Sequence, residues 1–249
     1  MITTGIDLAA QPERTAACVI EWGDGFGRVV DLRPRDVDDV QILTLVDAAD
    51  RTGIDVPFGW PDGFIAAVSA HHAALDWAGG DLAQLRMRAT DAWVRERTGR
   101  WPLSVSTDRI GVPALRVARV LARVPAARDR AGGGPVVEVY PAAALRIWGF
   151  KSRLYKRVAG AAARTALVAA FRAAAEGWLH LSAHEWEACD AGDDAFDALI
   201  AALVARAAAC GLVESCPREL REIASREGWI LLPLDGSLER LADMADTMG

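Results

Sequence analysis

Cysteine and lysine are scarce in this chain of 249 residues. The four cysteines form no Cys-x-x-Cys pair and have no histidine at zinc-site spacing, which argues against a zinc centre and against a disulfide framework. We expect them to be reduced and partly buried. Only Lys151 and Lys156 among the 28 basic residues are lysines. The chain is also rich in alanine, and codon bias can favour both residue types. The preference for arginine therefore indicates nothing about function by itself.

Long apolar runs are missing as well. No stretch reaches the roughly 18 consecutive apolar residues that a membrane-spanning helix needs. Residues 1–7 show neither the positively charged start nor the apolar segment of a secretion signal. We therefore expect a cytoplasmic protein that does not associate with membranes. The phosphate-binding loop GxxxxGK(S/T), the dinucleotide-binding GxGxxG after a strand and the GxSxG elbow of serine hydrolases are also absent, so these classes lose support.

An overall excess of positive charge is absent too, because 34 acidic residues outnumber the 28 basic ones and the net charge is −6. This argues against a uniformly basic surface for nucleic acid. The charges are nevertheless unevenly distributed. Residues 86–172 contain 18 basic and 5 acidic residues, and the rest of the chain contains 10 basic and 29 acidic ones. Either one region faces an anion while another concentrates carboxylates, or the charges lie on solvated helix faces and pair internally.

The hydrophobic pattern predicts an alternation of strands and helices. Three β-rich runs over residues 3–8, 16–21 and 28–32, with a glycine-rich turn before the third, predict an antiparallel meander. A helix is expected over 37–50 and a short buried strand over 53–57. Further along, the pattern predicts helices over 64–77, 82–97, 114–124, 142–148, 161–176, 194–210 and 217–227, and strands over 136–140 and 229–232.

This order of elements predicts a fold class and a domain organisation. The class is α/β, with a mixed sheet that begins as an antiparallel three-stranded meander, continues with parallel strands and is flanked by helices. The length suits a single domain over 1–249. The helices between the fourth and fifth strands are expected to form a helical insertion over 63–130.

Three strand-like apolar runs each contain one acid, namely Asp7, Asp55 and Glu138. A carboxylate among buried aliphatic residues is unfavourable unless it is paired or bound to a metal. One such acid could face water on an edge strand. Three of them, all near strand ends, favour a shared site.

A fourth apolar element, the helix expected over 194–210, carries Asp194 and Asp197 near its start. Their spacing places both on one helix face, where they could simply complement the helix dipole. The helix is otherwise almost wholly apolar, so we expect it to be buried and to carry Asp197 inward. Acids brought together in this way repel one another unless a cation neutralises them. Oxygen ligands without cysteine or histidine favour Mg²⁺ or Mn²⁺, which can support phosphodiester hydrolysis.

Six short motifs are spread over nearly the whole chain. They are Gly5-Ile6-Asp7, Ile54-Asp55-Val56-Pro57-Phe58-Gly59, Arg88-Ala89-Thr90-Asp91, Glu138-Val139-Tyr140-Pro141-Ala142, Tyr155-Lys156 and 194–198. In this order they resemble the family catalogued as domain of unknown function 429 (DUF429), described as predicted RNase H-like nucleases. The last acidic helix is also similar to that of Holliday-junction resolvases, which share the RNase H-like fold.

The resemblance implies roles for the acids. Asp7 would be the central metal ligand on the first strand, Asp55 would lie on the fourth strand, and Asp194 or Asp197 would complete the cluster. Asp55 stands where the resolvases usually have glutamate, and its shorter side chain bears on the number of metals. The family's activity is itself inferred largely from its fold.

Four residues, Arg88, Asp91, Arg109 and Lys156, are candidates for the substrate side of the site. Arginine binds phosphate oxygens through two parallel hydrogen bonds, and a lysine in the basic run 151–157 can contact a backbone phosphate. The same arginine–acid pairs could instead be buried salt bridges that fix the insertion. Lys156 could lie at a solvated helix end.

The function that best fits the sequence is a metal-dependent nuclease or phosphodiesterase that hydrolyses nucleic acid with Mg²⁺ or Mn²⁺. A homodimer would suit a branched substrate. The first alternative is a non-catalytic nucleic-acid or protein-binding module on the same fold. The second is an actin-like ATP-dependent phosphotransferase, although that class needs a second similar domain and glycine-rich phosphate turns, for which this chain leaves little room.

Overall fold

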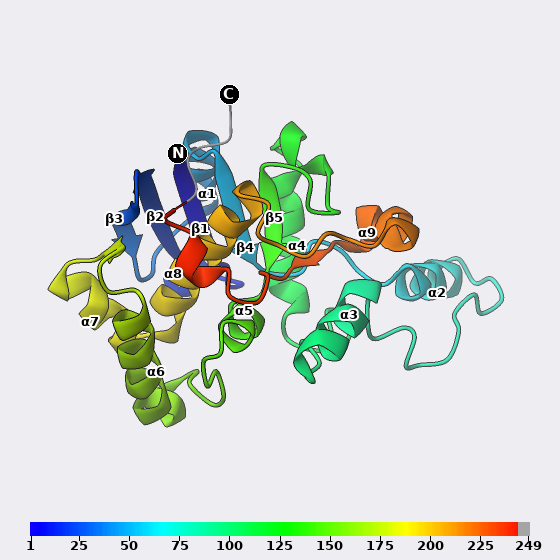
Figure 1. Cartoon of the computed structure of the whole chain (residues 1–249). Coiled ribbons are helices and arrows are strands. Elements are labelled where there is room, and N and C mark those ends of the chain that lie inside the picture. Colours follow the sequence, from blue (N-terminus) through cyan, green and yellow to red (C-terminus); the bar gives the residue numbers. More distant parts are fainter. Residues whose placement is uncertain (244–249) are drawn as a thin grey trace.

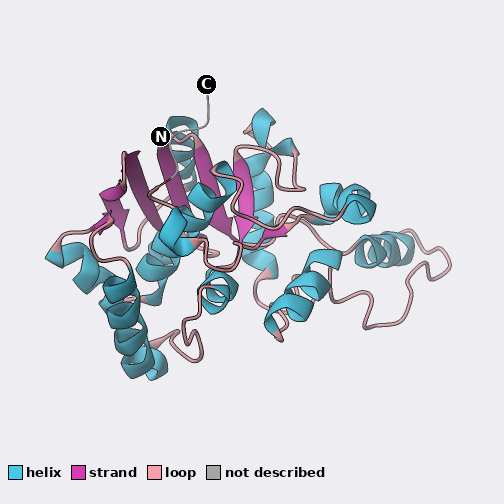
Figure 2. Ribbon diagram, in the orientation of Figure 1, coloured by secondary structure: helices cyan, strands magenta, loops and turns pink. Residues whose placement is uncertain are grey.

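The protein forms a seven-stranded mixed sheet with helices on both faces (Figures 1 and 2), as seen in a computed structural model that describes residues 1–243. The strand order is β6-β3-β2-β1-β4-β5-β7. β1, β2 and β3 are antiparallel neighbours, whereas β4, β5 and β7 continue the sheet in parallel from β1. The strands are β1 (Ile2–Asp7), β2 (Ala16–Gly23), β3 (Phe26–Arg33), β4 (Arg51–Asp55), β5 (Val136–Val139), β6 (Leu179–His180) and β7 (Ile230–Leu231).

Within the described residues, nine α-helices cover the two faces and the β7 end of the sheet. The central α8 crosses one face together with α5, α6 and α7, and α1 and α4 cover the other (Figure 1). They are α1 (Asp39–Ala48), α2 (Asp62–His72), α3 (Ala89–Thr98), α4 (Gly111–Leu121), α5 (Pro141–Ile147), α6 (Ala161–Ala174), α7 (Ala183–Ala191), α8 (Asp193–Ala209) and α9 (Arg221–Glu227).

This arrangement confirms the predicted fold class. It is α/β, and an antiparallel meander followed by parallel strands is the RNase H-like order. Helices α2, α3 and α4 all lie between β4 and β5 in the chain. That they form an insertion in a single domain stays a prediction. Among residues 1–243, no helix is both long and apolar enough to cross a membrane.

The buried helix α8 lies directly on β1 and β4 because both strands present a glycine to it. Gly5 and Gly53 are paired in register. A Cβ atom at Gly5 would overlap the backbone of Ala198 and Ala202, and one at Gly53 would lie 2.6 Å from the carbonyl oxygen of Ala201. Only glycine therefore permits this close approach of helix and sheet.

Three predictions of local structure need correction. The helix expected over 64–77 begins at Asp62 and ends at His72, just before Ala74 takes a positive φ angle of 54°. The helix expected over 82–97 begins only at Ala89, because the Asp91 carboxylate accepts a hydrogen bond from the Arg88 amide, 2.9 Å away, and so fixes the start of α3. The segment between α6 and α8 forms β6 and α7, which the hydrophobic pattern did not predict. A capping box, Ser182-x-x-Glu185, begins α7 and was the available sequence signal.

Candidate metal centre

Two acids lie side by side at the carboxyl ends of parallel strands. Asp7 ends β1, Asp55 ends β4, and the two residues are paired in register. Side chains alternate along a strand, so residues two apart share a face. Since Gly5 and Gly53 face α8, Asp7 and Asp55 point toward the same side of the sheet. The ends of parallel strands are a common place for sites in open α/β sheets.

Asp197 reaches these two acids from α8. It lies one turn before Ala201, the residue that rests on Gly53, so the glycine contact fixes how close its carboxylate comes. Asp7, Asp55 and Asp197 each offer an oxygen within 4.8 Å of the others. Asp197 is buried, whereas Asp7 and Asp55 keep an exposed edge. We call these three residues the acid cluster.

Lys156 supplies a cation to the acid cluster. Its Nζ lies 2.6 Å from Asp197 Oδ2 and 3.9 Å from Asp55 Oδ2. The preceding residue, Tyr155, is buried and donates a hydrogen bond from its hydroxyl group to Asp197 Oδ1, 2.6 Å away. The Lys156 side chain is 43% exposed, so its stem lies at the surface while its ammonium group points at the carboxylates. Both oxygens of Asp197 are thus held by one loop.

The surroundings raise the pKa of each carboxyl group in the cluster. Burial raises the pKa of Asp7 well above its usual value. The positive charge of Lys156 lowers this pKa, and repulsion from Asp197 and Asp55 raises it further. Burial likewise raises the pKa of Asp55 to about 7. The pKa of Asp197 is raised by burial even though Lys156 and Tyr155 lower it. The cluster therefore favours either shared protons or a strongly attracted cation.

The pKa of Lys156 shows the converse effect. Burial of its ammonium group lowers the pKa, but the negative charge of Asp197, followed by the influence of Tyr155 and Asp55, raises it well above the usual value. Lys156 is therefore firmly charged in the acid cluster.

Asp194 lies at the rim of the cluster in the first turn of α8. It is half-buried, and its carboxyl group interacts with that of Asp7. Burial raises its pKa, and so does repulsion from Asp193. Of the two aspartates expected on this helix, Asp197 therefore enters the cluster and Asp194 flanks it.

The structure does not bring Glu138 into the cluster, contrary to the expectation for the third strand acid. Glu138 is paired in register with Ile54 rather than with Asp55, and this offset of one residue turns its side chain to the opposite face of the sheet. There its carboxylate accepts hydrogen bonds from the Phe58 amide at 2.9 Å and from Arg88 at 2.7 and 2.9 Å.

Arg88 forms buried ion pairs with Asp91 and with Glu138. Both are buried, and all five N–H groups of the Arg88 guanidinium have acceptors in Asp91, Glu138 and the carbonyl oxygen of Glu227. No donor remains for a phosphate group. The negative charges of Glu138 and Asp91 raise the pKa of Arg88 despite its burial. The pair is thus a buried salt bridge, and a place for Arg88 and Asp91 on the substrate side stays a prediction.

A cleft opens beside the acid cluster. Its volume is about 250 Å³, and its lining includes Asp55, Tyr140 and Lys156 together with the paired Arg88 and Glu138. Pro102, Leu103 and Ile110, from the chain between α3 and α4, also line it. Arg109, the fourth candidate for the substrate side, is exposed next to Ile110. The cleft thus joins the acids to the region in which basic residues predominate.

The chain matches one protein family, described as "Protein of unknown function (DUF429)", over residues 5–222. The chain belongs to this family. The match includes all three acids of the cluster together with Tyr155 and Lys156, and it confirms the family resemblance of the sequence motifs. No curated protein and no solved structure gives a significant match to the chain.

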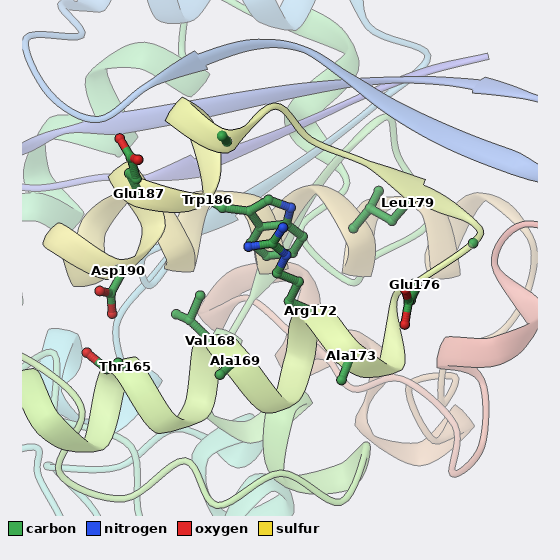
Figure 3. Close-up of a pocket in the computed structure, with 12 residues that line it drawn as sticks. Thr165, Val168, Ala169, Arg172, Ala173, Glu176, Leu179, Trp186, Glu187 and Asp190 are labelled. Carbon is green, nitrogen blue, oxygen red and sulfur yellow. The ribbon is translucent and has the colours of Figure 1, made fainter.

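Another hollow of this DUF429 protein lies between α6 and α7 and is separate from the acid cluster (Figure 3). Arg172 packs over the Trp186 ring there, 5.6 Å from its centroid. Glu176, Glu187 and Asp190 also line the hollow, and no residue of the acid cluster does. Its surplus of acids disfavours a polyanionic ligand.

Sequence reasoning missed the part that Tyr155 has in the site. In the sequence, Tyr155 stands out only as part of a family motif within the basic run 151–157. Its burial depends on packing against Phe196, whose ring centroid is 6.4 Å away, and this contact joins segments 41 residues apart in the chain. The only sequence signal for this burial was an aromatic residue among charged ones.

Proposed function

We propose that this protein is a metal-dependent phosphodiesterase acting on nucleic acid. The observation that carries the proposal is the convergence of Asp7, Asp55 and Asp197 from two strands and a helix, with carboxylate oxygens within 4.8 Å of one another. The burial of Glu138 is accounted for by its ion pair with Arg88. The acid cluster, in contrast, has more negative groups than its single lysine can neutralise.

The chemistry of the cluster fits a hard divalent cation. The three acids offer oxygen ligands only, and Mg²⁺ and Mn²⁺ prefer carboxylates with water completing the coordination. Asp7 and Asp55 keep an exposed edge toward solvent, which leaves room for water and substrate oxygens. When bound, such an ion would activate water and stabilise the charge that develops on the phosphate.

The residues of the chain have distinct tasks in this proposal. Asp7, Asp55 and Asp197 hold the ion. Tyr155 orients Asp197 through its hydroxyl group, so the ligand oxygen is placed before the ion arrives. Lys156 neutralises part of the charge of the cluster, and with an ion bound there its ammonium group would be available to a phosphate oxygen.

The region from residue 86 to residue 172 supports a nucleic-acid substrate. It contains 18 basic residues and 5 acidic ones, and it contributes Tyr140 and Lys156 to the cleft beside Asp55. A phosphodiester substrate is attracted by that charge and reaches the acids through the cleft. RNA, DNA and branched substrates all carry this backbone.

The decisive experiment compares the wild-type chain with Asp7→Asn and Asp24→Asn. Asp24 is exposed in the turn between β2 and β3, so its variant controls for the loss of one negative charge. We expect Mg²⁺- or Mn²⁺-dependent cleavage of labelled RNA or DNA by the wild type and by Asp24→Asn, and none by Asp7→Asn. In calorimetric titration, the wild type and Asp24→Asn should bind Mn²⁺, and Asp7→Asn should not. Cleavage that persists in Asp7→Asn, or that EDTA does not stop, would contradict the proposal.

A further inference from the structure

A second concave surface lies between α5, the following loop and α6. Its volume is about 750 Å³, which is within the usual range for ligand sites. Arg146 at the end of α5, residues 149–153 and one face of α6 line it. We call it the α5–α6 groove. None of the three acids lines it.

All charged residues that line the α5–α6 groove are basic. They are Arg146, Lys151 and Arg153, and each is exposed. Within residues 1–243, their side chains form no ion pair, unlike Arg226, which pairs with Asp62 and Glu222. Three unneutralised cations around one groove attract an anion with several negative charges.

The floor of the groove is apolar. It is formed by Phe150 and by one face of α6, where Ala163, Ala166, Leu167 and Ala170 lie on successive turns. The small side chains leave space above the helix, and Phe150 offers an aromatic surface. A ligand that pairs with the three cations and also packs on the apolar floor has anionic groups beside a flat, apolar part. A nucleotide whose base is unstacked has this composition.

One short loop contributes residues to both the α5–α6 groove and the acid cluster. Arg153 is separated from Lys156, whose ammonium group enters the cluster, by only two residues. Tyr155 fixes the same loop to Asp197. Leu154 and Arg157 on either side have positive φ angles of 57° and 64°, a conformation rare for such residues, so this path of the loop is specifically maintained.

The two sides of α6 differ in charge. The α6–α7 hollow in Figure 3 is lined by Glu176, Glu187 and Asp190 with one arginine, whereas the α5–α6 groove has three cations and no acid. A polyanion passing the acid cluster is therefore drawn to one side of α6 and repelled from the other.

We propose that the α5–α6 groove binds single-stranded nucleic acid next to the cleavage site, with phosphates on Arg146, Lys151 and Arg153 and an unstacked base on the floor. This inference rests on the proposed function and specifies its substrate, because a duplex keeps its bases stacked and cannot use the apolar floor. The protein then selects single strands or the unpaired part of a structured substrate.

The test measures binding without cleavage. Fluorescence anisotropy in EDTA compares labelled oligothymidylate and oligouridylate of about 15 nucleotides with a duplex of equal length. The groove variant is Arg146→Gln, Lys151→Gln and Arg153→Gln combined. Its matched control changes three exposed arginines away from the groove, as Arg123→Gln, Arg128→Gln and Arg218→Gln, and has the same net charge.

We expect the wild type and the control to bind the single strands more tightly than the duplex, and the groove variant to lose about tenfold or more in affinity. Three lost phosphate contacts should also reduce the slope of log K against log salt concentration by about two, at roughly 0.7 per contact on single strands. A variant with one acid on the floor, Ala166→Glu, should weaken binding without removing any cation. Equal affinity in the groove variant and the control, or a preference for duplex, would overturn the groove proposal.

Mn²⁺ titration separates this result from the proposed function. The groove variant should bind Mn²⁺ as the wild type does, because none of its three changes touches the acid cluster. If single strands bind the groove variant normally while Asp7→Asn alone abolishes cleavage, only the groove proposal fails. If neither Mn²⁺ binding nor cleavage is found in the wild type, the proposed function fails, and the anisotropy result still decides whether the groove binds single strands.

Discussion

Lys156 Nζ lies 2.6 Å from Asp197 Oδ2, so the acid cluster is already paired with a cation that the chain itself provides. A divalent ion bound by Asp197 and Asp55 has to displace this ammonium group or share the carboxylates with it. Lys156 therefore affects how tightly the cluster binds metal.

Replacing Lys156 with methionine tests this competition. Lys156→Met keeps the apolar stem and removes the charge, so we expect Mn²⁺ affinity measured by calorimetry to rise about tenfold, equivalent to about 1.4 kcal/mol. Lys151→Met, on the same loop but outside the cluster, should leave the affinity unchanged. Weaker Mn²⁺ binding by Lys156→Met would show that the lysine and the ion support each other instead of competing.

The glycine pair below the acids should be intolerant of any side chain. Gly5→Ala places a methyl group on the backbone of α8, and we expect it to lower the free energy of unfolding by about 3 kcal/mol or more. Gly192→Ala is the control, because a Cβ atom there has no neighbour closer than 4.0 Å. Urea denaturation measures both. Wild-type stability of Gly5→Ala would mean that α8 does not lie against β1 as described.

The buried pair of Arg88 and Glu138 should contribute to stability and not to binding of substrate or metal. Arg88→Met leaves Glu138 and Asp91 buried without their cation, so we expect a loss of about 3–5 kcal/mol in the free energy of unfolding. The double variant Arg88→Met, Glu138→Met should recover part of it. Where the single variant remains folded, its Mn²⁺ affinity should be that of the wild type. A normal free energy of unfolding together with weakened nucleic-acid binding would instead assign Arg88 to the substrate.

Asp39 should make the stability of the fold depend on pH. Burial raises the pKa of its carboxyl group, but hydrogen bonds from Arg116 and Arg119 on α4 outweigh this and lower the pKa below its usual value. A lowered pKa in the folded state means that the stabilisation is complete above the unfolded pKa of about 3.9. It is lost as the pH falls through the folded value.

The corresponding variant is Asp39→Asn. We expect it to be less stable than the wild type by about 1.5 kcal/mol at pH 7, measured by urea denaturation, and the difference to shrink as the pH falls below about 3.9. Asp47→Asn changes an exposed aspartate on the same helix and should have little effect at any pH. A difference for Asp39→Asn that is independent of pH would contradict this account.

Much of the architecture could be predicted from local patterns. Alternating apolar residues and a glycine-rich turn identified the meander, and the apolar run after Asp194 identified α8 as a buried helix. The late start of α3 and the existence of β6 and α7 were missed. The start of α3 depends on a capping hydrogen bond to Asp91, which hydrophobic periodicity does not show. Strand β6 pairs over only two residues and is too short to have a periodicity.

Acids at strand ends and in a buried helix could be predicted from the sequence alone, because a charged residue within an apolar run is visible in the sequence. Which of these acids come together depends on how the strands and helices pack. The register between β4 and β5 turned Glu138 to the other face, and the glycine pair brought Asp197 down onto Asp7 and Asp55. Strand register and helix-to-sheet distance depend on contacts between segments far apart in the chain, and no local pattern specifies them.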